Sequence, residues 1–97
     1  MMSELTEYFA GNTIWIDKFF LGKLFDVDIE QDLVLIYHPE ALPHMTQVKD
    51  DINVIFRHYL IEMVSLVVMS KSDFEKRYRL ADKFVLNLMR KTKTSDV

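Results

Sequence analysis

The residues between Pro43 and Ser70 form the longest segment of the chain with a regular hydrophobic period. Apolar residues recur there every three or four positions, which is the spacing of one face of an α-helix. The members of this face are Met45, Val48, Ile52, Ile55, Phe56, Tyr59, Leu60, Met63, Leu66 and Val67. The pattern predicts one long central helix, because a strand would need strict alternation over a shorter run.

A second apolar stripe lies on the opposite side of this expected helix. Val54, Ile61 and Val68 recur every seven residues, with Val64 beside them. A helix that is apolar on two sides is buried on both, either within its own chain or by another chain. A membrane span is not expected, because the nearly continuous apolar run covers only 11 residues, whereas a span needs roughly 20.

The C-terminal segment predicts a second helix over residues 72–91. Ser72 and Glu75 have the spacing of a capping box, in which the serine side chain caps the helix N-terminus. The apolar face of this helix comprises Phe74, Tyr78, Ala81, Val85, Leu88 and Met89. Because a short turn makes two consecutive helices antiparallel neighbours, residues 43–70 and 72–91 are predicted to form an αα-hairpin with its core between these faces. Residues 93–97 are expected to be a frayed tail.

The N-terminal part of the chain is less regular. Ser3 to Ala10 predicts a short helix, with Ser3 as its N-cap. Between Thr13 and Phe25 the apolar residues favour neither period, and length alone favours a helix. Residues 33–38 fit a buried strand or a short helix equally well, and Pro39 ends either one.

These segments predict a mostly α fold, in which short N-terminal helices pack on the C-terminal hairpin. With 97 residues, the chain is expected to be a single domain, because most domains hold about 50–250 residues. The alternative is an α+β fold with a short β-hairpin within residues 13–38.

Charge is distributed unevenly along the chain, whose formal net charge is −3. Residues 1–51 hold ten acidic and three basic residues, whereas residues 52–97 hold five acidic and nine basic ones. In a small domain, such halves are expected to lie beside each other. The chain has no cysteine, which fits a reducing interior and leads us to expect a cytoplasmic protein.

A row of acidic residues precedes the segment at residues 33–38. Asp26, Asp28, Glu30 and Asp32 stand two positions apart. A calcium-binding EF-hand would also need a glycine and a glutamate where Gln31 and Tyr37 stand, so calcium is not predicted. The row is interpreted as a solvated turn, or as an acidic contact that imitates nucleic-acid phosphates toward a basic partner.

The second predicted helix also has a basic face. Its members are Lys76, Arg79, Lys83 and Arg90. Aligned cations of this kind can follow a phosphate backbone, so a nucleic-acid-associated regulator is the alternative function. The net negative charge of the chain argues against a dedicated DNA-binding protein.

The expected surface for protein partners is apolar. Trp15, Phe19 and Phe20 belong to an aromatic-rich segment, which is expected either to pack as a wedge in the core against the central helix or to form an exposed anchor patch. The second interpretation is considered because large aromatic side chains dominate interface hot spots. With the stripe Val54, Ile61, Val64 and Val68 they exceed what one small core is expected to cover. The sequence therefore predicts a homodimer or an obligate hetero-partner.

The chain offers no recognisable catalytic or metal-binding pattern. His38, His44 and His58 lack ligand spacing, and there is no cysteine to complete a zinc site. Gly11 and Gly22 are isolated, so no phosphate-binding loop is expected. We therefore predict a non-enzymatic protein without cofactor or metal, acting as a regulator, adaptor, inhibitor or assembly subunit through apolar and acidic surfaces.

Overall fold

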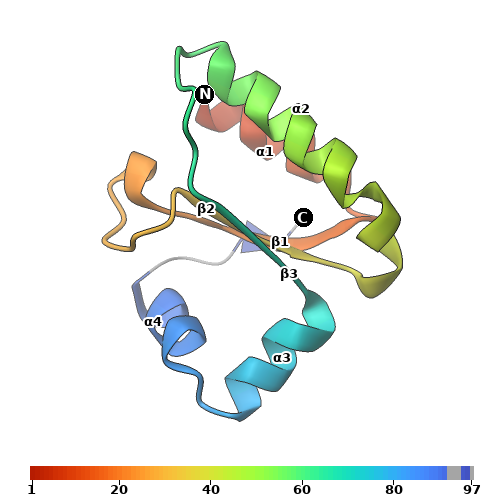
Figure 1. Ribbon diagram of the computed structural model, residues 1–97, viewed down its shortest axis with the longest axis vertical. Coiled ribbons are helices and arrows are strands. Elements are labelled where there is room, and N and C mark those ends of the chain that lie inside the picture. The colour runs from red at the N-terminus through yellow and green to blue at the C-terminus, as the bar shows by residue number, and fades with distance from the viewer. Residues whose placement is uncertain (92–94, 97) are drawn as a thin grey trace.

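The fold is α+β, as shown by a computed structural model that describes residues 1–91 and the backbone of residues 95 and 96 (Figure 1). In this part of the chain, helices lie on both faces of a mixed sheet. The order along the chain is α1 (Met2–Ala10), β1 (Ile16–Leu21), the 3-10 helix η1 (Lys23–Phe25), β2 (Leu33–Tyr37), the 3-10 helix η2 (Pro39–His44), α2 (Met45–Arg57), β3 (Leu66–Ser70), α3 (Lys71–Arg79), α4 (Lys83–Lys91) and β4 (Ser95–Asp96). The predicted mostly α fold is therefore wrong, and the α+β alternative is confirmed.

The strands lie side by side in the order β3-β2-β1-β4. β1 pairs antiparallel with both β2 and β4, while β2 and β3 are parallel, with Leu33 opposite Leu66 and Tyr37 opposite Ser70. The connection between the parallel strands contains α2. In Figure 1, α1 and α2 cover one face of the sheet, and α3 and α4 cover the other.

The molecule has a hydrophobic core on each face of this sheet. Side chains alternate between the two faces along a strand, so neighbours such as Phe19 and Phe20 belong to different cores. The core under α1 and α2 contains Leu5, Phe9, Ile16, Phe19, Leu33, Leu35, Ala41, Met45, Val48, Ile52 and Phe56. The core under α3 and α4 contains Phe20, Ile29, Val34, Ile36, Met69, Phe74, Val85 and Leu88.

The predicted central helix ends at Arg57, thirteen residues before Ser70. Leu60 adopts a left-handed conformation with φ of 62°. The Ile61 N–H donates to the Phe56 carbonyl at 3.1 Å, and the Leu60 N–H donates to the Arg57 carbonyl at 3.0 Å. This is the Schellman pattern of a helix C-terminus. This helix end could not be predicted from the sequence, because its left-handed position, which usually holds glycine, here holds leucine.

The remainder of the predicted helix is extended and leads into β3. Its β-branched valines favour a strand, and its partner β2 supplies the hydrogen bonds that stabilise one. The αα-hairpin over residues 43–70 and 72–91 is therefore wrong, since β3 separates α2 from α3. The expected contact between the two faces is also wrong, because Phe56 and Val85 lie in different cores, while Tyr59, Met63 and Tyr78 are exposed.

The predicted helix over residues 72–91 is two helices. α3 ends in a second Schellman pattern, in which Ala81 has φ of 54° and the Asp82 N–H donates to the Arg77 carbonyl at 2.9 Å. The N-cap also differs from the prediction. Ser70 caps α3, because its Oγ accepts from the Asp73 N–H at 3.1 Å, two residues before the predicted Ser72.

The N-terminal helix is confirmed as α1, but the predicted N-cap Ser3 is wrong, because the helix begins at Met2 and has no side-chain cap. It is tied to α2 by Tyr8, whose phenol donates to Asp51 Oδ2 at 2.7 Å. Burial, together with this hydrogen bond and the nearby Asp51 charge, raises the pKa of Tyr8. Tyr59 reaches back to α1 as well, where its phenol donates to Glu4, and this bond raises the pKa of Tyr59.

The helix favoured over residues 13–25 is wrong, because β1 occupies its centre and pairs with β2 as the hairpin of the alternative prediction. Gly22 follows β1 where the chain passes close to β2. A Cβ at Gly22 would lie 1.9 Å from the Gln31 carbonyl oxygen, so only glycine fits. Of the expected tail, residues 93, 94 and 97 lie outside the described residues, and Ser95–Asp96 form β4.

Candidate interaction surface

The start of β3 is held to the end of the preceding loop by Asp32. This residue is 9% exposed, and its carboxylate oxygen Oδ2 accepts from the Ser65 N–H at 2.8 Å. The Ser65 carbonyl accepts from the Asp32 N–H at 2.8 Å and from the Leu33 N–H at 3.2 Å. These bonds set the register of β3 against β2.

One edge of β3 has no strand beside it within the described residues. Successive residues of a strand direct their N–H and C=O groups to opposite sides. Since those of Ser65 face β2, the groups of Leu66 and Val68 face the open edge, as does the Ser70 N–H. An open edge of this kind is a template for pairing with another strand.

The open edge lacks the features that usually protect one. From Met63 to Ser70 the sequence is MVSLVVMS, with no charged residue and no proline. Natural proteins usually blunt such edges with charges, prolines, bulges or a covering segment. Unpaired backbone groups have no residue signature, so the sequence shows only the uncharged run from Met63 to Ser70 and not the edge itself.

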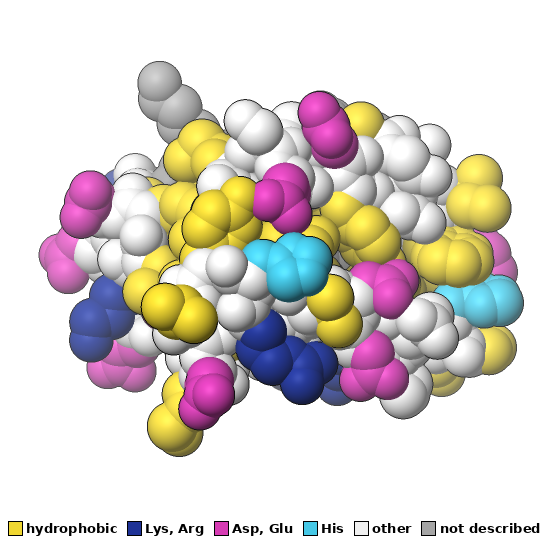
Figure 2. Space-filling view, turned by 90° about the horizontal axis from the view of Figure 1, so that it is seen from above, with side chains coloured by type: hydrophobic (Ala, Val, Ile, Leu, Met, Phe, Trp, Pro, Cys, Tyr) yellow, Lys and Arg dark blue, Asp and Glu magenta, His cyan; other side chains and the backbone are white. Residues whose placement is uncertain are grey.

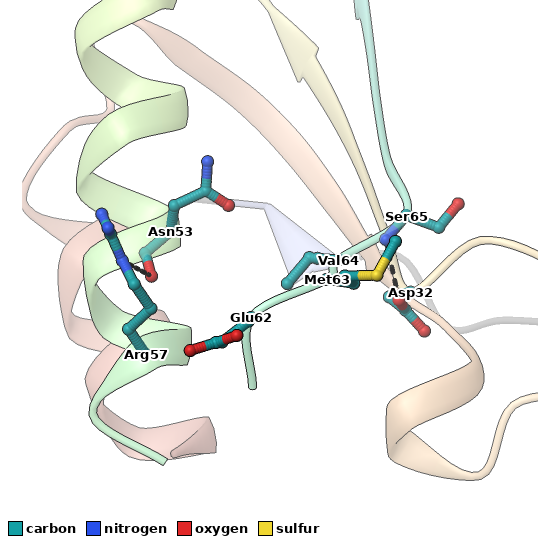
Figure 3. A pocket seen from close by; sticks show the side chains of 7 residues that line it. All are labelled: Asp32, Asn53, Arg57, Glu62, Met63, Val64 and Ser65. Carbon is teal, nitrogen blue, oxygen red and sulfur yellow. Dashed lines mark hydrogen bonds between the residues drawn. The ribbon is translucent and has the colours of Figure 1, made fainter. Parts of the chain in front are cut away.

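A hollow lies beside the start of β3 (Figure 3). Its lining residues are Asp32, Asn53, Arg57, Glu62, Met63, Val64 and Ser65. In Figure 3 the Val64 side chain points toward α2, whereas the Met63 side chain points toward Asp32. Met63 is 90% exposed, so this large apolar side chain has almost no cover in the monomer.

A second hollow lies beside the end of β3, on the side of α3 and α4. It is lined by Tyr37, Val67, Val68, Met69, Ser70, Asp73, Arg77 and Phe84. Arg77 forms ion pairs with Asp73 at 3.0 Å and with Asp82 at 3.9 Å. Each end of the open edge therefore has a hollow that is lined by both apolar and charged residues.

The predicted apolar interface residues occupy different environments. Phe19 and Phe20 are buried in the two cores, so neither reaches the surface of the monomer. Trp15 is half-buried and stacks on His44, with ring centroids 4.7 Å apart. The predicted stripe is divided between α2, the extended segment and β3: Val54 is exposed on α2, while Ile61, Val64 and Val68 are half-buried. Val64 and Val68 lie along the open edge.

The four acidic candidates do not form one surface row. Asp26, Asp28 and Glu30 are exposed in the loop between β1 and β2, whereas Asp32 is turned inward to β3. Asp26 has φ of 63° at the end of η1. Lys91 donates to Asp28 Oδ2 at 2.7 Å, and this hydrogen bond lowers the pKa of Asp28.

The four basic candidates lie on two helices, not on one face of a single helix. Lys76 and Arg79 belong to α3, and Lys83 and Arg90 belong to α4 beyond the turn at Ala81. All four are exposed. The opposite layer has a mixed surface, since Figure 2 shows hydrophobic side chains among acidic, basic and histidine side chains above α1 and α2.

Within residues 1–91, no group of three or more histidine, aspartate or glutamate side chains is arranged to hold a metal ion. Nor does any helix in this range have the length and hydrophobicity needed to cross a bilayer. Comparison of the chain with protein-family models, with curated proteins and with solved structures found no match.

Proposed function

We propose that this chain is a non-enzymatic protein-interaction protein, such as a regulator, adaptor, inhibitor or assembly subunit, which acts in the cytoplasm. It binds a protein partner that adds a strand to the open edge of β3. In this mode of recognition the main-chain hydrogen bonds supply affinity, and pockets for side chains supply specificity.

The observation that carries the proposal is the unprotected edge itself. The outward groups of Leu66 and Val68 are free to pair, and the two hollows can receive side chains of an added strand. The nucleic-acid alternative has weaker support, because its cations are divided between α3 and α4. In the same layer, Arg77 is paired with Asp73 and Asp82, and Lys91 is paired with Asp28.

Affinity capture with matched variants tests this proposal. The tagged chain would be expressed in its native cells as wild type, Val68→Pro and Leu80→Glu, and bound proteins would be identified by mass spectrometry. Val68→Pro removes the Val68 N–H, which faces the open edge and makes no hydrogen bond to β2. Proline is tolerated at such edge positions. Leu80→Glu changes a side chain that is 71% exposed at the end of α3, away from the edge.

We expect at least one protein to be recovered with the wild type and with Leu80→Glu but lost with Val68→Pro. Circular dichroism of the purified variants would check that all three are folded. Identical sets of recovered proteins for the three folded chains would mean that the edge does not bind partners. Capture of nucleic acid that is lost on reversing Lys76 and Arg79 would favour the alternative function.

A further inference from the structure

The row of unpaired groups on β3 is complementary to itself in the antiparallel direction. If Val68 of one copy lies opposite Val68 of a second copy, the two residues can exchange N–H···O=C hydrogen bonds. The same register places Leu66 opposite Ser70, so each Ser70 N–H can donate to a Leu66 carbonyl of the other copy. Shifting the register by one residue would set inward-facing groups of one copy against outward-facing groups of the other.

The exposed Met63 side chain gains a partner surface in this register. Met63 of one copy lies beyond the last paired residue, beside the start of α3 in the other copy, where Asp73 lines the hollow at the end of β3. Val64, Leu66 and Val68 pack toward α1 and α2. Figure 3 shows the Met63 side chain pointing toward Asp32 and away from α2, opposite to that of Val64.

Charge does not oppose this arrangement. The paired segment from Met63 to Ser70 is uncharged. Arg57 and Glu62 stand beside the start of β3, and Asp73 and Arg77 stand beside its end. In an antiparallel pair, the start of β3 in one copy lies beside the end of β3 in the other. Each of these junctions therefore brings both acidic and basic side chains together. Both edges are already ordered, so pairing avoids the entropic cost that a disordered peptide would pay.

We propose that the occupant of the β3 edge is a second copy of this chain, which pairs antiparallel to form a two-fold symmetric dimer with a continuous sheet. Met63 of each copy enters the hollow formed by Val67, Met69, Asp73, Arg77 and Phe84 of the other. This inference rests on the proposed function in that it uses the same edge, and it names the partner. A perpendicular two-fold axis places both α2 helices on one face of the joined sheet.

Sedimentation velocity of the purified chain tests the dimer, with wild type, Val68→Pro, Met63→Glu and Leu80→Glu compared over a range of concentrations. We expect the wild type and Leu80→Glu to dimerise alike, and each edge variant to weaken association at least about tenfold, which corresponds to about 1.4 kcal/mol. Met63→Glu keeps the test valid should Val68→Pro fail to fold, because Met63 is 90% exposed and its replacement removes almost no packing.

Amide hydrogen exchange reports the pairing directly. In the dimer, the amides of Val68 and Ser70 should be protected and lose this protection on dilution, whereas those of Val67 and Met69, which face β2, should stay protected. A folded wild type that is monomeric at about 500 µM, a concentration at which even weak pairing is visible, would overturn the dimer. A dimer whose association is unaffected by both edge variants would overturn the pairing at the β3 edge.

The two proposals fail differently. A monomeric wild type whose captured partners are still lost with Val68→Pro would overturn the self-pairing and leave the strand-addition function standing. The opposite outcome is a dimer that dissociates in both edge variants while the same proteins are captured with the wild type and with Val68→Pro. This result would support the self-pairing and overturn the proposed binding of other proteins at this edge.

Discussion

At the scale of single residues, the turns of this chain depend on left-handed backbone positions that lack glycine. Asp26, Leu60 and Ala81 have φ between 54° and 63°. Each lies at the C-terminal end of a helix. A side chain in this conformation places its Cβ close to a carbonyl oxygen, at a cost of roughly 1–2 kcal/mol. The packing of the elements that follow must compensate for this strain.

Replacing Leu60 by glycine is therefore expected to stabilise the protein. The side chain is 91% exposed, so its removal loses almost no packing. Glycine relieves the left-handed strain, but it also has greater entropy in the unfolded chain. The net effect should raise the free energy of unfolding by about 0.5–1 kcal/mol. Urea denaturation followed by circular dichroism measures this change.

The matched control is Leu80→Gly. Leu80 is also exposed, but its φ is −86°, so glycine relieves no strain there. This variant should be less stable than the wild type by up to about 1 kcal/mol. Equal shifts for the two variants would show that the left-handed conformation of Leu60 carries no cost.

At the scale of elements, β3 depends on one buried carboxylate. Asp32 accepts the Ser65 N–H, which comes just before the strand. Leu66–Ser70 is the outer strand of the parallel pair and is only half-covered along most of its length. The Asp32 side chain therefore adds to the two backbone hydrogen bonds that the Ser65 carbonyl accepts in holding the start of β3.

Asp32→Ala should destabilise the protein by about 1–3 kcal/mol, because it leaves the Ser65 N–H without its acceptor. Asp32→Asn keeps an acceptor oxygen at the same place and should cost less. Chemical denaturation gives both free energies, and hydrogen exchange should show faster exchange of the Ser65 amide in the alanine variant. If alanine and asparagine are equally stable, the hydrogen bond does not hold the strand.

At the scale of the whole molecule, two separate cores share one thin sheet. Neither helical layer contacts the other through a common core, since β1 and β2 lie between them. The strands nevertheless contribute side chains to both cores. Unfolding one layer would expose one face of the sheet, so the two layers are expected to unfold together.

The variants Phe56→Ala and Leu88→Ala test this coupling, because they truncate one fully buried side chain in each core. We expect losses of about 3–5 kcal/mol for Phe56→Ala and about 2–5 kcal/mol for Leu88→Ala. Each variant should still give one transition by near-ultraviolet and far-ultraviolet circular dichroism. Two separate transitions would mean that the layers unfold independently.

The surface variant Leu86→Ala serves as the control for Leu88→Ala. Leu86 lies on the same helix but is 43% exposed, so its truncation should cost much less. Because the two cores are on opposite faces, the losses of the double variant Phe56→Ala and Leu88→Ala should add.

Some features could be read from the sequence because they depend on neighbouring residues alone. The periodic apolar face from Met45 to Phe56 predicted the buried side of α2, and Ile52 and Phe56 are indeed fully buried. The short helix before Gly11 and the end of an element at Pro39 followed from local chemistry in the same way. These properties require no knowledge of the rest of the chain.

The tertiary structure decided the elements whose residues suit more than one conformation. The apolar residues between Ile61 and Met69 fit the period of a helix. Only the hydrogen bonds of β2 make Leu66–Ser70 a strand. The same holds for β1, which is stabilised by its pairing with β2. The open edge of β3 arises only once the order of the strands is established, so no local pattern of residues could reveal it.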